Sequence, residues 1–228
     1  TERRVQKVRK AVTSPGEAKD DWWITSQIAK RMGAKGFDYN SAKEIMQEIN
    51  EVTPSYKGIT FERIEDTGIQ WPCPDTDHPG TKFLHSEKFA RQGGKGRLFP
   101  LTYKVSIELP DGDYPLLLTT DRSLYHYHTA TMTRRVEGLE DLDGEEFLRI
   151  NPKDAEKMGI KSGDMLTVKS RRGEVRVKAD VNRICPEGVA SLTFHFHETR
   201  TNELTNCAVD PVAKIPETKV CAIKVEKI

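Results

Sequence analysis

The chain has 228 residues, with 36 Lys and Arg against 35 Asp and Glu, so its formal net charge is +1. This length suits one large domain or one domain with a sizeable extension, and the near-zero charge removes the electrostatic argument for a nucleic-acid binder. No stretch approaches the roughly 18–20 apolar residues of a membrane helix, and a secretory signal start is absent, so we expect a soluble globular protein.

The first fifty residues predict two helices. Asp20 and Asp21 precede apolar residues at three- and four-residue spacing, and Gly33 provides a stop. The apolar positions are Trp22, Trp23, Ile24, Ile28, Ala29 and Met32. Ser41-Ala42-Lys43-Glu44 is a capping box for a second helix that we expect to bury Ile45 and Ile49. Two short helices cannot enclose a core, so we expect them to dock on other sequence, including residues outside this chain.

Residues 54–113 are irregular in pattern, because frequent prolines break any long helix and Gln92–Gly96 is rich in glycine. A long loop-rich stretch inside an ordered protein is usually functional or wraps over neighbouring domains. We therefore predict three parts: a helical region over 1–53, a loop-rich linker over 54–113 and a β domain over 114–228.

The predicted β domain consists of short strands around one small helix. Strands are expected over 116–118, 165–170, 174–179, 189–196 and 221–225, with a hairpin at Arg171-Arg172-Gly173. Asn151 caps the helix, Pro152 occupies its first turn and Gly159 ends it. Several short strands with one or two small helices suggest a compact barrel.

The densest polar segment, Thr119–Thr129, directly follows a predicted buried strand, where the end of a sheet often holds a ligand. Its hydroxyls, one Arg and two His can donate many hydrogen bonds to an anion such as a phosphate. Arg122 is the best single candidate, because its planar fork matches phosphate oxygens. The alternatives are an exposed polar loop, or core histidines satisfied by backbone carbonyls.

Other polar groups give weaker signals. The pairs His126/His128 and His195/His197 each point to one face of a strand and could build a metal site, but satisfied structural histidines are favoured. Cys73 would need His78 or His85 as a base to act as a nucleophile, and a structural thiol is favoured there too. The four cysteines are scattered and form no C-x-x-C pair, which fits neither a disulfide scaffold nor a zinc or iron–sulfur site and favours a reduced cytoplasmic location.

Several motifs resemble the molybdenum and tungsten oxidoreductases related to dimethyl sulfoxide reductase. Asn151–Asp164 and the Ser170–Gly173 hairpin are similar to the C-terminal domain of that family, which binds a molybdopterin guanine dinucleotide. Within the family the similarity is greatest to the catalytic subunit of formate dehydrogenase. Four stretches carry it: 1–6, 68–73 with its Gln-Trp-Pro-Cys motif, 125–135 with its Tyr-His-Tyr-His-Thr motif, and 202–204 with 216–219.

The resemblance implies a six-stranded double-psi β-barrel for 114–228, preceded by the helical end of a central α/β region and a linker. It also implies which residues bind the dinucleotide. These are Thr119, Thr120, Arg122, Ser123, Leu124, His126, His128, Phe194, Asn202, Thr218 and Lys219. Thr218 stands where the family has an aromatic residue, and the resemblance assigns no catalytic residue or metal ligand to this chain.

The function implied is cofactor holding in a formate dehydrogenase that converts formate to carbon dioxide at a bis-molybdopterin guanine dinucleotide with Mo or W. The family's catalytic cysteine or selenocysteine and its 4Fe-4S motif have no match here, so we expect the chain to be inactive alone. Its expected partners are the remaining catalytic subunit and iron–sulfur electron-transfer subunits. The alternatives are a separately encoded subunit of a formylmethanofuran dehydrogenase-like enzyme, and a non-catalytic docking barrel. A nitrate reductase is a weaker interpretation of the same motifs.

Overall fold

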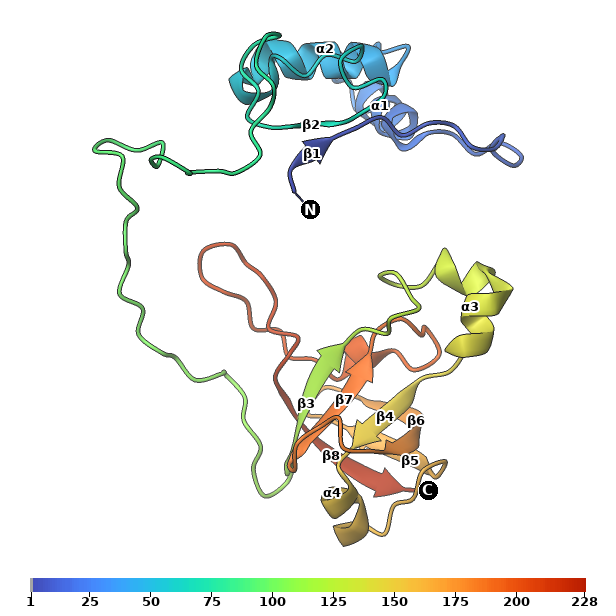
Figure 1. Ribbon diagram of the computed structural model, residues 1–228. Coiled ribbons are helices and arrows are strands. Elements are labelled where there is room, and N and C mark those ends of the chain that lie inside the picture. Colours follow the sequence, from blue (N-terminus) through green and yellow to red (C-terminus); the bar gives the residue numbers. More distant parts are fainter. Residues whose placement is uncertain (1) are drawn as a thin grey trace. The chain divides into compact units, whose positions relative to one another are not determined.

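The computed structural model describes residues 2–228, which form two units, one ending at Pro100 and the other running from Leu101 to Ile228 (Figure 1). The elements of the first unit are β1 (Arg4–Val5), α1 (Asp21–Arg31), α2 (Ala42–Val52), a 3-10 turn (Pro54–Tyr56) and β2 (Ile69–Gln70). β1 and β2 pair antiparallel. None of the helices within residues 2–228 has the length and apolar character needed to span a bilayer.

The two predicted helices begin and end close to the predicted residues. Gly33 adopts a φ of +81° just after α1, as its role as a helix stop requires. The Ser41 hydroxyl accepts a hydrogen bond from the Glu44 N–H at 3.3 Å, which caps α2. The Glu44 carboxylate, however, accepts from the Asn40 N–H at 2.8 Å, one residue earlier than a capping box predicts.

The apolar faces of these helices are only partly covered within their own unit. On α1, Ile28 is 55% exposed and the following Met32 is 81% exposed. Ile45 and Ile49 of α2, which the sequence predicts to be buried, are half-buried within the described residues. The buried apolar residues of the unit lie further along the chain. They are Ile59, Ile64 and Cys73, against which Val5, Met46, Tyr56, Ile69 and Trp71 pack, whereas the only buried residue of α1 is the polar Ser26.

The second unit contains a closed barrel. Its strands are β3 (Leu116–Asp121), β4 (Phe147–Ile150), β5 (Met165–Lys169), β6 (Glu174–Val181), β7 (Val189–Thr193) and β8 (Cys221–Lys227). Around the closed ring the order is β3-β7-β4-β6-β5-β8, with β3–β7 and β4–β6 parallel and the other neighbours antiparallel. The remaining elements are α3 (Glu137–Leu142), α4 (Pro152–Lys157) and 3-10 turns at Thr133–Arg135 and Thr201–Glu203. The expected six-stranded double-psi β-barrel is confirmed.

The barrel core follows from the alternation of side chains along each strand. In β3 every second residue is buried, beginning with Leu116, because successive side chains point to opposite faces of a strand. The largest fully buried apolar residues of the barrel cluster are Leu118, Leu148, Ile150, Leu166, Val168, Leu192, Leu204 and Ile223. In this unit β4, α3 and the two 3-10 turns escaped the sequence-based prediction, and β4 supplies two of these core residues.

The structure contains the helix and the hairpin that the local sequence predicts in this unit. The Asn151 side chain caps α4 by accepting from the Lys153 N–H at 3.0 Å, and Gly159 adopts a φ of +66° beyond the end of the helix. The β5–β6 hairpin pairs Lys169 with Glu174, and its turn closes with a 2.9 Å bond from the Ser170 N–H to the Gly173 carbonyl.

Candidate functional site

Two parallel strands bring distant loops to one end of the barrel. β3 and β7 pair in register so that Asp121 lies opposite Thr193, and their arrowheads point the same way in Figure 1. The segments that follow, residues 122–131 and 194–203, therefore leave the sheet at the same edge. Ligands commonly bind where neighbouring parallel strands end, because the loops there converge while the strands hold them rigidly.

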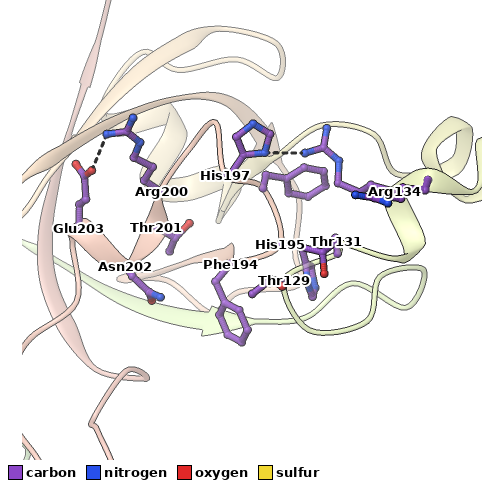
Figure 2. Close-up of a pocket in the computed structure, with 13 residues that line it drawn as sticks. Thr129, Thr131, Arg134, Phe194, His195, His197, Arg200, Thr201, Asn202 and Glu203 are labelled. Carbon is purple, nitrogen blue, oxygen red and sulfur yellow. Dashed lines mark hydrogen bonds and ion pairs between the residues drawn. The ribbon is translucent and has the colours of Figure 1, made fainter. Parts of the chain in front are cut away.

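A pocket of about 700 Å³ lies between these two segments (Figure 2). Its lining consists of Thr129, Ala130, Thr131, Arg134, Arg135, Phe194, His195, Phe196, His197, Arg200, Thr201, Asn202 and Glu203. Figure 2 shows Arg134 and Arg200 on opposite sides of it, with Asn202 on the side of Arg200 and Phe194 between the two arginines. The mixture of aromatic walls, hydroxyls and guanidinium groups suits a large polar ligand with ring systems.

Not all of these cations are available to a ligand. Arg134 donates hydrogen bonds of 2.9–3.1 Å to the carboxylates of both Glu140 and Glu198. These bonds lower the pKa of both carboxyl groups and raise the pKa of the guanidinium, so all three groups stay charged and the positive charge of Arg134 is fully offset by its two partners. Arg200 is paired with Glu203 at 3.2 Å.

Two other guanidinium groups have no ion pair within the described chain. Arg135 lines the pocket, and the exposed Arg122 lies beside it with its Cζ 5.1 Å from the centre of the Phe194 ring. Among residues 2–228, the guanidinium of Arg122 makes one hydrogen-bond contact, a long 3.5 Å approach to Nδ1 of His128. Their charges are therefore free to bind an anion.

Thr201 carries an unsatisfied hydroxyl on the pocket wall. The residue is only 2% exposed, and its Oγ1 has no hydrogen-bond partner in residues 2–228. Leaving a buried hydroxyl unbonded costs roughly 1–3 kcal/mol, so such groups in folded proteins usually face a ligand or a water molecule.

Comparisons with known proteins agree with this geometry. Residues 116–222 match a family described as the molydopterin dinucleotide binding domain, and residues 1–31 match one described as molybdopterin oxidoreductase. The chain belongs to the molybdopterin oxidoreductases. The barrel is its dinucleotide-binding domain, and all residues that line the pocket lie within the matched range.

Individual relatives match most or all of the chain. It is 50% identical over 229 residues to the F420-dependent formate dehydrogenase subunit alpha of Methanocaldococcus jannaschii, spanning 100% of this chain but 34% of that protein. It is 36% identical to the assimilatory nitrate reductase catalytic subunit of Bacillus subtilis, over 92% of this chain and 31% of that one. Acetylene hydratase from Pelobacter acetylenicus shares the fold, with a TM-score of 0.69 at 18% identity over 96% of this chain and 34% of the hydratase. The chain thus spans about a third of these relatives.

The dinucleotide-binding domain places the residues predicted from sequence in three groups. Phe194 and Asn202 line the pocket, and Arg122 contacts the Phe194 ring. Ser123 and His128 are tied to the buried His195: the Ser123 N–H donates to its Nε2 at 2.9 Å, and its Nδ1 bonds the His128 carbonyl.

The second group joins the end of β3 to the segment before β8. The Thr120 hydroxyl donates to the Thr218 carbonyl at 3.1 Å, and the Lys219 ammonium donates to the Thr120 carbonyl. These contacts fix the tail residues beside β3 without consuming the Thr218 hydroxyl.

The third group has no contact that points to a ligand. Thr119 is half-buried on the outer face of β3, and Leu124 is 90% exposed. His126 is buried, with Nδ1 3.0 Å from the Thr133 hydroxyl and Nε2 2.5 Å from the Asp143 carbonyl. Both of its ring nitrogens are therefore engaged inside the protein, as for a core histidine satisfied by a backbone carbonyl.

Sequence reasoning overlooked several pocket residues. Arg134 and Arg135 lie within the 125–135 motif, so their basic pair was a usable signal for an anion site. Thr201 left no such signal, because its importance comes from a missing partner and not from its type. Arg200 was also missed; it sits in a left-handed conformation with φ +49°, ahead of the 3-10 turn that carries Thr201.

The metal and nucleophile hypotheses receive no geometric support. Within the described part of the chain, no three His, Cys, Asp or Glu side chains are grouped so as to hold a metal ion. His197 is 85% exposed at its side chain, whereas His195 is buried. Cys73 is 0% exposed, with its Sγ 3.4 Å from the Arg63 guanidinium, and His78 offers it a carbonyl and not its ring.

Proposed function

We propose that the barrel holds the guanine dinucleotide of a bis-molybdopterin cofactor in a formate dehydrogenase. The observation that carries this proposal is the pocket at the ends of β3 and β7: the unbonded hydroxyl of Thr201 and the guanidinium of Arg135 belong to its lining, and the guanidinium of Arg122 lies against the Phe194 ring of its wall. The residues fit the group: guanidinium forks suit diphosphate oxygens, Phe194 gives a stacking face, and Asn202 can pair with a purine edge.

The residues predicted from sequence take their roles within this proposal. Arg122 binds phosphate oxygens, Asn202 and Thr218 bind polar edges of the dinucleotide, and Lys219 fixes the end of β3. Thr119, Thr120, Ser123, Leu124, His126 and His128 complete or support the wall, with Phe194 as its aromatic face. When bound, the metal–pterin group supplies the redox chemistry, accepting two electrons as formate becomes carbon dioxide and a proton. The chain's own contribution is to bind and orient it.

The wider setting is part of the same proposal. It includes Mo or W as the metal, a 4Fe-4S cluster in the remaining catalytic subunit, iron–sulfur partner subunits and a cytoplasmic location. It also keeps the division into a helical end of the central region (1–53), a linker (54–113) and the dinucleotide domain (114–228). The 50% identity over the whole chain to a formate dehydrogenase subunit favours formate over nitrate, and disfavours both the formylmethanofuran dehydrogenase-like subunit and the docking barrel.

The test compares Arg122→Ala and Thr201→Val in the full-length enzyme, with Arg183→Ala as control, since Arg183 is exposed on the same barrel away from the pocket. For each variant we would measure the guanine nucleotide released by acid hydrolysis and the metal content, both per protein molecule. We expect Arg122→Ala to weaken retention about tenfold or more, as for loss of a hydrogen bond to a charged group. Thr201→Val should lose cofactor yet stabilise the cofactor-free protein, because it removes an unsatisfied hydroxyl.

Arg183→Ala should keep the parent content. Parent-level dinucleotide in both pocket variants would overturn this site. Absence of any pterin from intact parent enzyme would instead favour a barrel that serves only for docking.

A further inference from the structure

His195 joins the two loops that form the pocket. It lies two residues beyond β7 and is 2% exposed. Its Nε2 accepts the N–H of Ser123 at 2.9 Å, and its Nδ1 bonds the carbonyl of His128. Both partners belong to the loop after β3, which is separated from His195 by 67 and 72 residues of chain.

These partners fix the state of the ring. A backbone N–H can only donate and a carbonyl can only accept, so Nε2 must be bare and Nδ1 must carry the proton. A doubly protonated ring would place two N–H groups face to face at Ser123. Only the neutral Nδ1–H form makes both bonds at once.

We infer that His195 is a positioning residue, whose neutral Nδ1–H tautomer holds the loop after β3 in the shape that presents Arg122 to the dinucleotide. That Arg122 is presented to a dinucleotide rests on the proposed function. The link that His195 makes between the two loops does not depend on that function. Arg122 directly precedes the residue that His195 anchors, and no ion pair within residues 2–228 holds its guanidinium. The position of Arg122 therefore depends on the backbone at Ser123, together with the contacts of its guanidinium with the Phe194 ring and His128.

The loop needs such an anchor. His128 and Ala130 adopt φ values of +50° and +59°, a left-handed conformation that is disfavoured for residues with a Cβ and persists only where the surroundings hold it. The carbonyl that His195 binds belongs to the first of these residues. Releasing it would let this turn relax toward ordinary backbone conformations.

The anchor is itself held on several sides. The ring packs against His126, Phe194 and Phe196, with centroid distances of 5.8, 5.7 and 6.3 Å. Its backbone N–H approaches the Thr193 hydroxyl at 3.5 Å, and that hydroxyl donates to the buried Glu146 carboxylate. Because the ring cannot rotate freely in this setting, it transmits a fixed position from β7 to the loop after β3.

Three substitutions separate the two bonds. His195→Asn places an amide N–H near the position of Nδ1 and keeps the tie to His128, whereas His195→Gln places an amide oxygen near the position of Nε2 and keeps the tie to Ser123. His195→Leu fills the space and makes neither bond. His85→Asn is the matched control, since His85 is exposed in the other unit.

The first experiment measures two quantities for each full-length variant: the amount of bound guanine dinucleotide per enzyme and the midpoint of thermal unfolding. We expect a loss of about tenfold in retention for His195→Leu, partial rescue by Asn and by Gln, and the parent value for His85→Asn. Retention that simply follows the unfolding midpoint across the three variants, without rescue, would reduce His195 to a packing role and overturn the inference.

The second experiment needs no cofactor. Trypsin cleaves after arginine, and the bond between Arg122 and Ser123 is the one that His195 anchors. Cleavage there, mapped by mass spectrometry in the full chain, should be at least fivefold faster in His195→Leu than in the parent, with cleavage after Arg183 unchanged.

The two experiments separate the two proposals. Faster cleavage at Arg122 together with parent-level dinucleotide in the Arg122→Ala enzyme would keep the link between the loops and reject the cofactor site. Unchanged cleavage in His195→Leu would overturn the link whatever the cofactor content. If His195→Leu does not fold, the Asn and Gln variants provide the same comparison.

Discussion

Truncation of Leu204 tests how strongly the pocket depends on the barrel core. Leu204 directly follows the 3-10 turn Thr201–Glu203 on the pocket wall, is 0% exposed and belongs to the barrel core cluster. Leu204→Ala removes three buried carbon atoms, about 2.4 kcal/mol of transfer free energy at about 0.8 kcal/mol per carbon. A residual cavity adds a further cost, so we expect a loss of about 3 kcal/mol, within the usual range of about 2–5 kcal/mol.

The assay is denaturant unfolding of the barrel in the full chain, with two matched variants. Leu192→Ala removes an equally buried leucine from β7, whereas Ile184→Ala truncates a residue that is 72% exposed and should change stability by less than about 0.5 kcal/mol. Leu204→Ala and Leu192→Ala should lose similar stability, but Leu204→Ala should lose more dinucleotide, because it frees the turn that carries Thr201.

The reasoning fails if Leu204→Ala is as stable as Ile184→Ala. Equal dinucleotide retention in Leu204→Ala and Leu192→Ala would refute only the mechanical link to the pocket.

Burial raises the pKa of Glu146 above its ordinary value, against the opposing hydrogen bond from Thr193, so the folded state holds its proton at pH values where the unfolded chain has lost it. The free energy of unfolding should therefore fall as pH rises from about 4.5. Glu146→Gln, whose amide oxygen still accepts the hydrogen bond from Thr193, should remove that part of the fall. Parallel pH profiles of the unfolding free energy for variant and parent would contradict this. In the first unit, an added Cβ at Gly58 would lie 1.8 Å from a backbone oxygen and 2.8 Å from the Cys73 Sγ, whereas Gly112 has open space. Gly58→Ala should accordingly expose Cys73 to thiol-specific labelling and Gly112→Ala should not; a Cys73 that stays unlabelled in Gly58→Ala would show that the neighbouring backbone can give way.

The sequence predicted the barrel well where a local signal existed. Alternating residues gave β5 and β6, and the Asn151 cap with its following proline gave α4, since these features depend on neighbours in the chain. β4 was missed because four residues, Phe147–Ile150, are too few to show an alternation. The closure of the barrel came from the family resemblance, because no local pattern specifies which strands meet.

The site was harder to predict for a physical reason. Arg122 was a candidate because its planar guanidinium matches phosphate oxygens and it lies in a dense polar segment directly after a strand. Thr201 and His195 matter through partners that the fold supplies or withholds, and those partners lie far away in the chain. Neither the unsatisfied hydroxyl of Thr201 nor the hydrogen bond between His195 and Ser123, 72 residues apart, can be predicted from the neighbouring residues in the sequence.

The pairing of β3 bears on the order of folding events. This strand is bordered by β7 and β8, which follow it by about 70 and about 100 residues, and contacts so distant in sequence form slowly. The carbonyl of Thr218 and the ammonium of Lys219 reach Thr120 only when β8 has docked. A partly folded chain with β8 detached would lack Cys221 and Ile223 from its core and would have no complete wall for the dinucleotide, so we expect binding competence only after the ring has closed.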